Sequence, residues 1–124
     1  MRCWVMPAGA IGAVAGIKLL GLTAWLTYPL LAVEEPENQL YPELLPELAE
    51  EFRDYARRGG QVFISSHSPD FLNALTLEEI FCLRKDAGFT TIRCAADSAN
   101  LQALFKAGDL PGYLWKQGLF EGVN

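Results

Sequence analysis

The stretch LLAVEEPENQLYP, Leu30 to Pro42, decides how the rest of the chain is interpreted. It opens with four apolar residues, Leu30 to Val33, a run that is too short for a helix and typical of a strand covered on both faces. Two adjacent glutamates, Glu34 and Glu35, follow directly, and Glu37 comes one proline later. Like charges at the end of a buried segment repel each other and resist desolvation, so we expect a positive group to bind there.

The residues after this stretch predict a helix and a second strand. From Glu43 to Arg58, apolar residues recur at helical spacing, acids and arginines fill the other face, and Gly59 and Gly60 supply the stop. QVFISS, Gln61 to Ser66, is a second apolar, β-branched run, and the turn-prone HSPD follows it. We therefore predict a βαβ unit with two parallel strands and a right-handed crossover.

Polar side chains follow both predicted strands. Glu34 and Glu35 come after the first strand, and Ser65, Ser66 and His67 come at the end of the second. In parallel sheets, ligands bind beyond the carboxyl ends of the strands. We therefore expect the two clusters to lie at one edge of the sheet, within reach of each other.

This pair of clusters suits a site that holds a divalent cation and activates a water. Magnesium is usually bound by one or two carboxylates together with waters and substrate phosphates. A second carboxylate that is not a ligand can orient the attacking water as a general base. A histidine at the neighbouring strand end would then reach the terminal phosphate or the water.

At these residues the sequence resembles a known family. LLAVEEPENQLYP is similar to the Walker B strand and following loop of ABC-type ATPases, in the branch that contains the SMC and RecF-like proteins and the bacterial AAA-type ATPases. QVFISSHSPDFLNAL, Gln61 to Leu75, resembles the switch-histidine segment of the same group, and the tail DLPGYLWKQGLFEG agrees as well. The resemblance extends from Ile17 to the C-terminus. It implies an α/β fold in three layers: a partial P-loop NTPase parallel sheet flanked by helices, followed by a β-hairpin and short helices.

The resemblance also implies roles for individual residues. Glu34 stands where the family has its magnesium-associated acid, commonly an aspartate, and Glu35 stands at the catalytic glutamate that polarises water. His67 stands at the switch histidine, which senses the γ-phosphate. Asn38, in a loop that reaches across a dimer in the family, and Ser66 are the implied nucleotide contacts. The implied cofactors are Mg²⁺ and ATP.

The phosphate-gripping part of such a domain has no counterpart in the sequence. No GxxxxGK[ST] motif occurs, and PAGAIGAVAGIK, although glycine-rich, lacks GK[ST] and lies directly before the Walker B-like strand. In VAGIK, Val14 occupies the place of the phosphate-contacting serine of the signature motif, and valine cannot donate that hydrogen bond. We therefore expect residues 17–124 to form the C-terminal lobe of the ATPase domain, after an unassigned apolar segment at 1–16.

A lobe without its phosphate cradle has consequences for activity and partners. Both Mg²⁺ and ATP are expected only when a P-loop half completes the site, and we do not expect the chain to hydrolyse ATP alone. The missing strands would leave an open sheet edge and an uncovered apolar face. We expect a second copy of the chain, or a complementary ATPase half, to cover them.

Composition narrows the class of protein. The 124 residues are 51% apolar and 20% charged, as expected of one small globular domain, and the net charge of -5 gives no nucleic-acid footprint. Three cysteines without metal-ligand spacing indicate reduced thiols and a cytoplasmic protein, and the single histidine excludes a His-rich metal site. Lys18 divides the apolar N-terminal stretch, so we expect a buried helix at Ile17 to Tyr28 and no membrane span or signal peptide.

Farther along the chain, Ile80 to Arg84 and Thr90 to Cys94 flank a turn containing Gly88 and predict a hairpin. Two short helices are expected near Ser98 to Ala107 and Pro111 to Gln117. The cluster Arg53, Arg57 and Arg58 is interpreted as complementing the negative end of a helix dipole.

Other interpretations remain open at this point. The glutamates alone would suit a solvated acidic loop at the start of the next helix, and His67 would suit a hydrogen-bonded turn. A Ser-His-acid hydrolase is disfavoured because no GxSxG elbow occurs. A non-catalytic remnant or interaction module with the same fold, and a membrane-anchored variant, are the remaining alternatives.

Overall fold

The computed structural model describes residues 2–5, 30–38 and 40–122. The strands are β1 (Arg2–Val5), β2 (Leu30–Glu34), β3 (Gln61–Ser66), β4 (Ile80–Asp86) and β5 (Phe89–Cys94); the helices are α2 (Leu45–Arg57), α3 (Pro69–Leu72), α4 (Ala99–Lys106) and α5 (Pro111–Lys116). Short 3-10 turns lie at Pro42–Leu44, Leu77–Glu79, Ala95–Asp97 and Leu119–Gly122.

Two of the predictions for the N-terminal part concern residues that the structure does not describe. The helix expected at Ile17 to Tyr28 and the segment VAGIK both lie outside the described residues. Among the residues that are described, none belongs to a helix with the length and apolar character needed to cross a bilayer.

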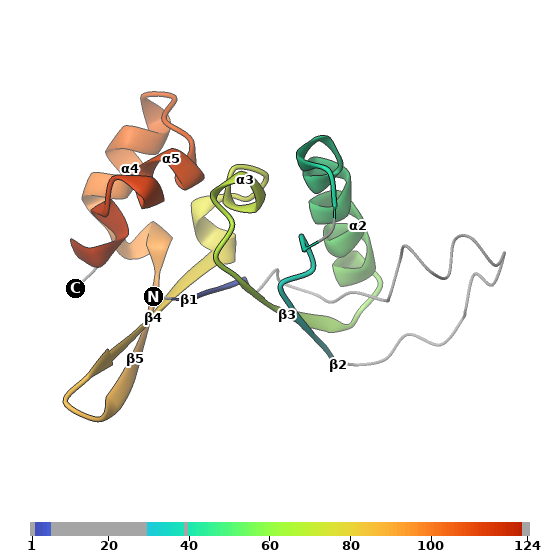
Figure 1. The fold of residues 1–124 in the computed structure, drawn as a ribbon, viewed down its shortest axis with the longest axis horizontal. Coiled ribbons are helices and arrows are strands. Elements are labelled where there is room, and N and C mark those ends of the chain that lie inside the picture. Colours follow the sequence, from blue (N-terminus) through green and yellow to red (C-terminus); the bar gives the residue numbers. More distant parts are fainter. Residues whose placement is uncertain (1, 6–29, 39, 123–124) are drawn as a thin grey trace, which may run out of the picture.

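The strands form one five-stranded sheet in the order β2-β3-β1-β4-β5 (Figure 1). β2 and β3 are parallel, with Leu30 opposite Gln61 and Glu34 opposite Ser65, which confirms the predicted pairing of the βαβ unit. The expectation of a parallel sheet is wrong at β1, which runs antiparallel to both β3 and β4. β5 runs antiparallel to β4, as the predicted hairpin requires. β1 comes from the segment to which the sequence analysis assigned no element.

β2 is not covered on both faces as predicted. Leu30 is 55% exposed and Ala32 is also exposed, whereas Leu31 packs against the core. The cause is the position of the strand, since β2 is at the edge of the sheet and the described helices lie on one side of it (Figure 1). The described residues therefore form two layers where three were expected, and the α/β class is confirmed in this coarser form.

Helix α2 covers β3 with the amphipathic face that its sequence predicts. Its buried residues are Leu45, Ala49, Phe52, Tyr55 and Ala56, at helical spacing. Phe52 meets Phe71 of α3 edge-to-face, with ring centroids 6.2 Å apart and an interplanar angle of 87°. These contacts join the βαβ unit to the C-terminal part of the chain in a single core.

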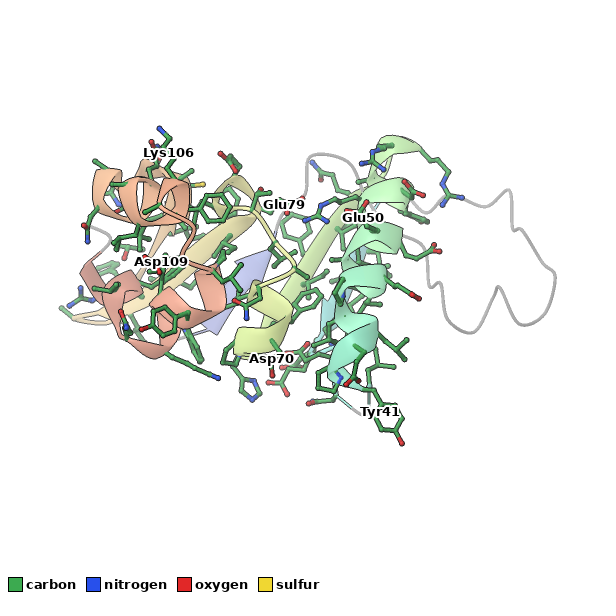
Figure 2. The ribbon with its side chains drawn as sticks, turned by 90° about the horizontal axis from the view of Figure 1, so that it is seen from above. Tyr41, Glu50, Asp70, Glu79, Lys106 and Asp109 are labelled. Carbon is green, nitrogen blue, oxygen red and sulfur yellow. The ribbon has the colours of Figure 1, made fainter. Side chains whose placement is uncertain are left out.

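Arg53 of α2 links the same two parts through a half-buried ion pair. Its guanidinium donates to both carboxylate oxygens of Glu79, at 2.7 and 2.6 Å, and to the carbonyl of Ala74 at 2.8 Å. Glu79 also accepts the backbone N–H of Thr76 at 2.9 Å as part of a capping box. Figure 2 shows Glu79 beside the helix that carries Glu50. Arg57 and Arg58 lie at the end of α2 as predicted, but Arg53 acts through Glu79 and not through the helix dipole.

The C-terminal part follows the sequence prediction closely. The hairpin turn is formed by Ala87 and Gly88, both with positive φ (46° and 92°), the geometry that a two-residue hairpin turn requires. α4 and α5 lie where the two short helices were expected. Gly112 in α5 packs directly on α3, where its N–H donates to Asn73 Oδ1 at 2.8 Å.

Candidate functional site

The two polar clusters meet at one edge of the sheet, as the parallel pairing predicts. Glu34 is in register with Ser65, and the backbone N–H of Glu35 donates to the Ser65 carbonyl at 2.7 Å. The loop after β2 is therefore hydrogen-bonded to the C-terminal end of β3. Tyr41, beyond the first loop, and Asp70, beyond the second, both lie toward this edge (Figure 2).

Glu35 and His67 are in direct contact. His67 Nδ1 lies 2.8 Å from Glu35 Oε1, and Asn38 Nδ2 donates to Glu35 Oε2 at 2.8 Å. The carboxylate is about a quarter exposed and the imidazole more than half exposed, so both are accessible from solvent. The predicted convergence of an acid and the lone imidazole is confirmed.

The backbone of Glu35 is strained. Its φ is 45°, in the left-handed region that residues other than glycine, asparagine and aspartate rarely adopt. Two backbone bonds hold it there, from Glu35 N–H to the Ser65 carbonyl at 2.7 Å and from Asn38 N–H to the Glu35 carbonyl at 3.0 Å. The turn thus directs the Glu35 side chain toward the loop that carries His67.

Glu37 is the buried acid of this edge, and the sequence analysis gave it no role. Its side chain is 8% exposed, and Ser66 Oγ, 2% exposed, donates to Glu37 Oε1. Oε2 is buried and accepts no hydrogen bond among the described residues. Nothing in the local pattern marks Glu37 as buried, because its partner is 29 residues away in the sequence.

The loop after β3 is fixed at both sides of His67. Ser66 Oγ accepts the N–H of Ser68 at 3.1 Å, and Ser68 Oγ in turn accepts the N–H of Phe71 at 3.3 Å as the N-cap of α3. His67 therefore projects from a short turn between a buried strand end and a capped helix.

Glu34, the predicted magnesium-associated acid, is at the last position of β2 and is exposed. Within the described residues, no three acidic, histidine or cysteine side chains gather closely enough to hold a metal ion by themselves. The donor set fits Mg²⁺ all the same, because this ion keeps several waters and takes one or two carboxylates, with phosphates completing its shell. Whether Glu34 binds it stays a prediction.

Asn38 and Ser66, the predicted nucleotide contacts, both bond to acids of the site. Asn38 holds Glu35, and Ser66 holds Glu37. Their contact with nucleotide stays a prediction, and their contacts within the protein show that they order the carboxylates.

Two of the simpler interpretations fit this geometry less well. A solvated acidic loop does not describe Glu37, which is buried. The turn that leads into α2 has Tyr41 at its N-cap and no side-chain capping bond, so the cluster does not cap that helix; Glu43 and Glu47 are the acids of its first turns. Ser66 donates to Glu37, which is not the arrangement of a Ser-His nucleophile.

Comparison with known families gives one match. Residues 16–73, just under half of the chain, match the model of the family described as "AAA domain, putative AbiEii toxin, Type IV TA system". Among curated proteins and among solved structures, no significant match is found. The matched range contains Glu34, Glu35, Asn38, Ser66 and His67, and it supports an AAA, P-loop NTPase-like domain of the ATPase type.

Proposed function

We propose that the chain is the Walker B and switch-histidine portion of an ATP-binding, ATP-hydrolysing AAA-type ATPase of the ABC-like branch that contains the RecF and SMC proteins. In this proposal Glu34 associates with Mg²⁺, Glu35 activates water and His67 senses the γ-phosphate. The observation that carries it is the 2.8 Å contact between Glu35 Oε1 and His67 Nδ1, made by residues from the ends of two parallel strands.

The geometry leaves Glu35 able to act as a base. In this proposal a water donates to the Glu35 carboxylate while His67 and Asn38 stay bound, since a carboxylate oxygen has two lone pairs. A water at this place would donate to Glu35 and lie close to the imidazole. Orientation of such a water is the part of the chemistry that these residues would supply.

The metal would be held at the exposed end of β2. Glu34 offers a carboxylate there, next to the acid that would orient water. When bound, Mg²⁺ supplies neutralisation of the phosphate charge. The remaining ligands would be waters and phosphate oxygens, as is usual for this ion.

The grip on the nucleotide has to come from another segment. The 124 residues contain no GxxxxGK[ST] motif, whose backbone amides and lysine bind phosphates. We propose that a P-loop-bearing half, or a second copy of the chain together with such a half, completes the site. The absence of the motif also favours a second candidate, a non-catalytic remnant or interaction module that keeps this fold.

Calorimetry with Mg²⁺-ATP separates the two candidates. The chain is titrated together with a P-loop-bearing half of such an ATPase, and three variants are compared in the same way: Glu34→Gln, Glu35→Gln and, as a matched control on the exposed face of α2, Glu47→Gln. If the chain is part of an ATPase, Glu35→Gln and Glu47→Gln should bind Mg²⁺-ATP as the parent does, and Glu34→Gln should bind it more weakly in a magnesium-dependent way. In protein completed by a P-loop-bearing half, Glu35→Gln should abolish hydrolysis. If the completed protein gives no heat of binding at millimolar nucleotide while every variant is folded, the result favours the non-catalytic module.

A further inference from the structure

Glu37 and Ser66 form the buried polar contact of this edge of the sheet. Both side chains are more than nine-tenths buried, and the hydroxyl of Ser66 donates to Glu37 Oε1 across 29 residues of sequence. Oε2 of Glu37 is buried and accepts no hydrogen bond from the part of the chain that the structure describes, which makes the burial of this carboxylate costly. A buried carboxylate that is only partly hydrogen-bonded is unfavourable for stability, so its presence indicates a role other than packing.

The contact between Glu37 and Ser66 holds the turn that carries His67. Before the histidine, the Ser65 carbonyl accepts the N–H of Glu35 at 2.7 Å. After it, the N–H of Ser68 donates to Ser66 Oγ at 3.1 Å, and the same oxygen donates its proton to Glu37. The hydroxyl of Ser66 therefore connects the acidic loop to the backbone on the far side of His67.

We propose that Glu37 is a positioning residue: through Ser66 it holds the turn after β3 so that the imidazole of His67 stays against Glu35. Its relevance to hydrolysis rests on the function proposed above, whereas the positioning itself does not require that function. Loss of the contact would leave the Ser66 hydroxyl free to rotate away, and the turn would be fixed by the backbone bond between Glu35 and Ser65 and by the Ser68 cap of α3.

The chain offers a direct readout, because His67 is its only histidine. A long-range ¹H–¹⁵N spectrum therefore shows one imidazole. A carboxylate that accepts from Nδ1 holds the proton on that nitrogen when the ring is neutral. The two nitrogen shifts of this single ring report whether His67 is in contact with Glu35, independently of nucleotide and of activity.

The test compares variants at both ends of the contact. Glu37→Met removes the acceptor at similar size, Glu37→Gln keeps an oxygen that can accept from Ser66, and Ser66→Ala removes the donor. Glu47→Met, at an exposed position of α2, is the control for a glutamate-to-methionine change, and Glu35→Ala gives the spectrum of an uncoupled histidine. Thermal unfolding of each variant is recorded alongside the spectrum.

We expect the nitrogen shifts of Glu37→Met and Ser66→Ala to move most of the way to those of Glu35→Ala. Glu37→Gln and Glu47→Met should keep the parent shifts. Both substitutions remove the Glu37–Ser66 bond, and Ser66→Ala also removes the bond from Ser68 N–H to the same oxygen. The double variant should therefore move the shifts no farther than Ser66→Ala alone.

Two results would overturn the inference. Glu37→Met or Ser66→Ala with the parent histidine shifts, in folded protein, would show that the contact is structural only. If Glu37→Met does not fold, the histidine shifts of Ser66→Ala decide the question. If neither variant folds, Glu37→Gln decides it: this variant keeps an acceptor for Ser66, so shifts like those of Glu35→Ala in folded Glu37→Gln would contradict the inference. Failure of the proposed function alone gives another result: Glu37→Met would still change the histidine shifts, but protein completed by a P-loop-bearing half would not bind Mg²⁺-ATP.

Discussion

The site half of the fold (residues 30–38 and 40–68) and the packing half (residues 69–122) share one apolar core but differ in the polar side chains that they bury. Among the described residues, the buried polar or charged ones, Glu37, Ser65 and Ser66, all lie in the site half. The packing half buries apolar groups, including Phe71, Leu72, Leu77, Ile80, Leu101, Leu114 and Phe120. Burial of apolar area stabilises a fold, whereas a buried polar group contributes little when it is hydrogen-bonded and costs stability when it is not.

This difference indicates a division between stability and chemistry. The packing half contributes close-packed apolar side chains that stabilise the fold, and the site half holds its carboxylates at the edge of the sheet. If the division is correct, substitutions in the packing half change the free energy of unfolding strongly and leave His67 in contact with Glu35. Substitutions of the polar site residues Glu35, Glu37 and Ser66 should do the reverse.

The largest effect is expected at Gly112. A Cβ at this position would lie 1.9 Å from the carbonyl oxygen of Pro69 and 2.6 Å from Asn73 Oδ1. The first of these is backbone and cannot move without separating α3 from α5, so Gly112→Ala should destabilise the fold by about 3 kcal/mol. Chemical denaturation measures this directly.

Gly108→Ala is the control for Gly112→Ala. Gly108 has φ of 105° and no atom within 4 Å of an added Cβ, so its substitution brings backbone strain without a clash. We expect a loss of about 1 kcal/mol. Equal losses at the two positions would contradict the close packing of α3 on α5.

How far the sequence predicts these features depends on how local their causes are. The strand Gln61–Ser66, helix α2 and the hairpin were predicted correctly, because periodicity, a glycine stop and a turn residue are all local. The contact of Gly112 with Pro69 was not predicted, since it exists only after α3 and α5 pack. For the same reason Arg53 was interpreted as a dipole partner, although its partner Glu79 lies 26 residues on.

The site shows the same limit. The approach of Glu35 to His67 followed from parallel strand pairing alone and was predicted, because carboxyl ends of parallel strands share an edge. The burial of Glu37 did not follow, because an acid with polar neighbours looks solvated until Ser66 is placed beside it. The strand β1 was not predicted because four residues carry too little local pattern, and β1 is defined by its pairing with β3 and β4.

The second effect concerns the ion pair between the halves. Burial alone would raise the pKa of Glu79, but hydrogen bonds from Arg53 and from the Thr76 backbone outweigh it and lower the pKa below its ordinary value. The hydrogen bond to Glu79 raises the pKa of Arg53. Arg53→Met should therefore cost about 2 kcal/mol at neutral pH, because it leaves a half-buried carboxylate without its main donor.

The sign of the pH dependence follows from the lowered pKa of Glu79. The unfolded state takes up the proton first as pH falls, so this pair stabilises the fold above the unfolded pKa of about 4.3 and ceases to do so as pH falls through the folded pKa. Denaturation at neutral and acidic pH measures this, with Arg57→Met, whose side chain is 64% exposed, as the matched control. A penalty for Arg53→Met that is unchanged in acid would contradict the role of the pair.

The smallest effect compares one strained position in each half. Glu35 and Ala87 have nearly the same positive φ, 45° and 46°, which costs a residue with a Cβ about 1 to 2 kcal/mol. Ala87→Gly relieves this strain in the hairpin, where the side chain is exposed. Glycine also makes the unfolded chain more flexible, which offsets part of the benefit, so we expect the free energy of unfolding to rise by about 0.5 to 1 kcal/mol. Glu35→Gly relieves the same strain but also removes the contacts to His67 and Asn38.

The gain for Glu35→Gly should therefore be smaller than for Ala87→Gly by about 0.5 kcal/mol, the usual contribution of partly exposed polar contacts. Only Glu35→Gly should move the nitrogen shifts of His67. The difference between the two free energies measures what the Glu35 side chain contributes to stability, separately from the strain of its backbone. A loss of several kcal/mol on Glu35→Gly would make this carboxylate a main support of the fold, and the division between the two halves would not hold.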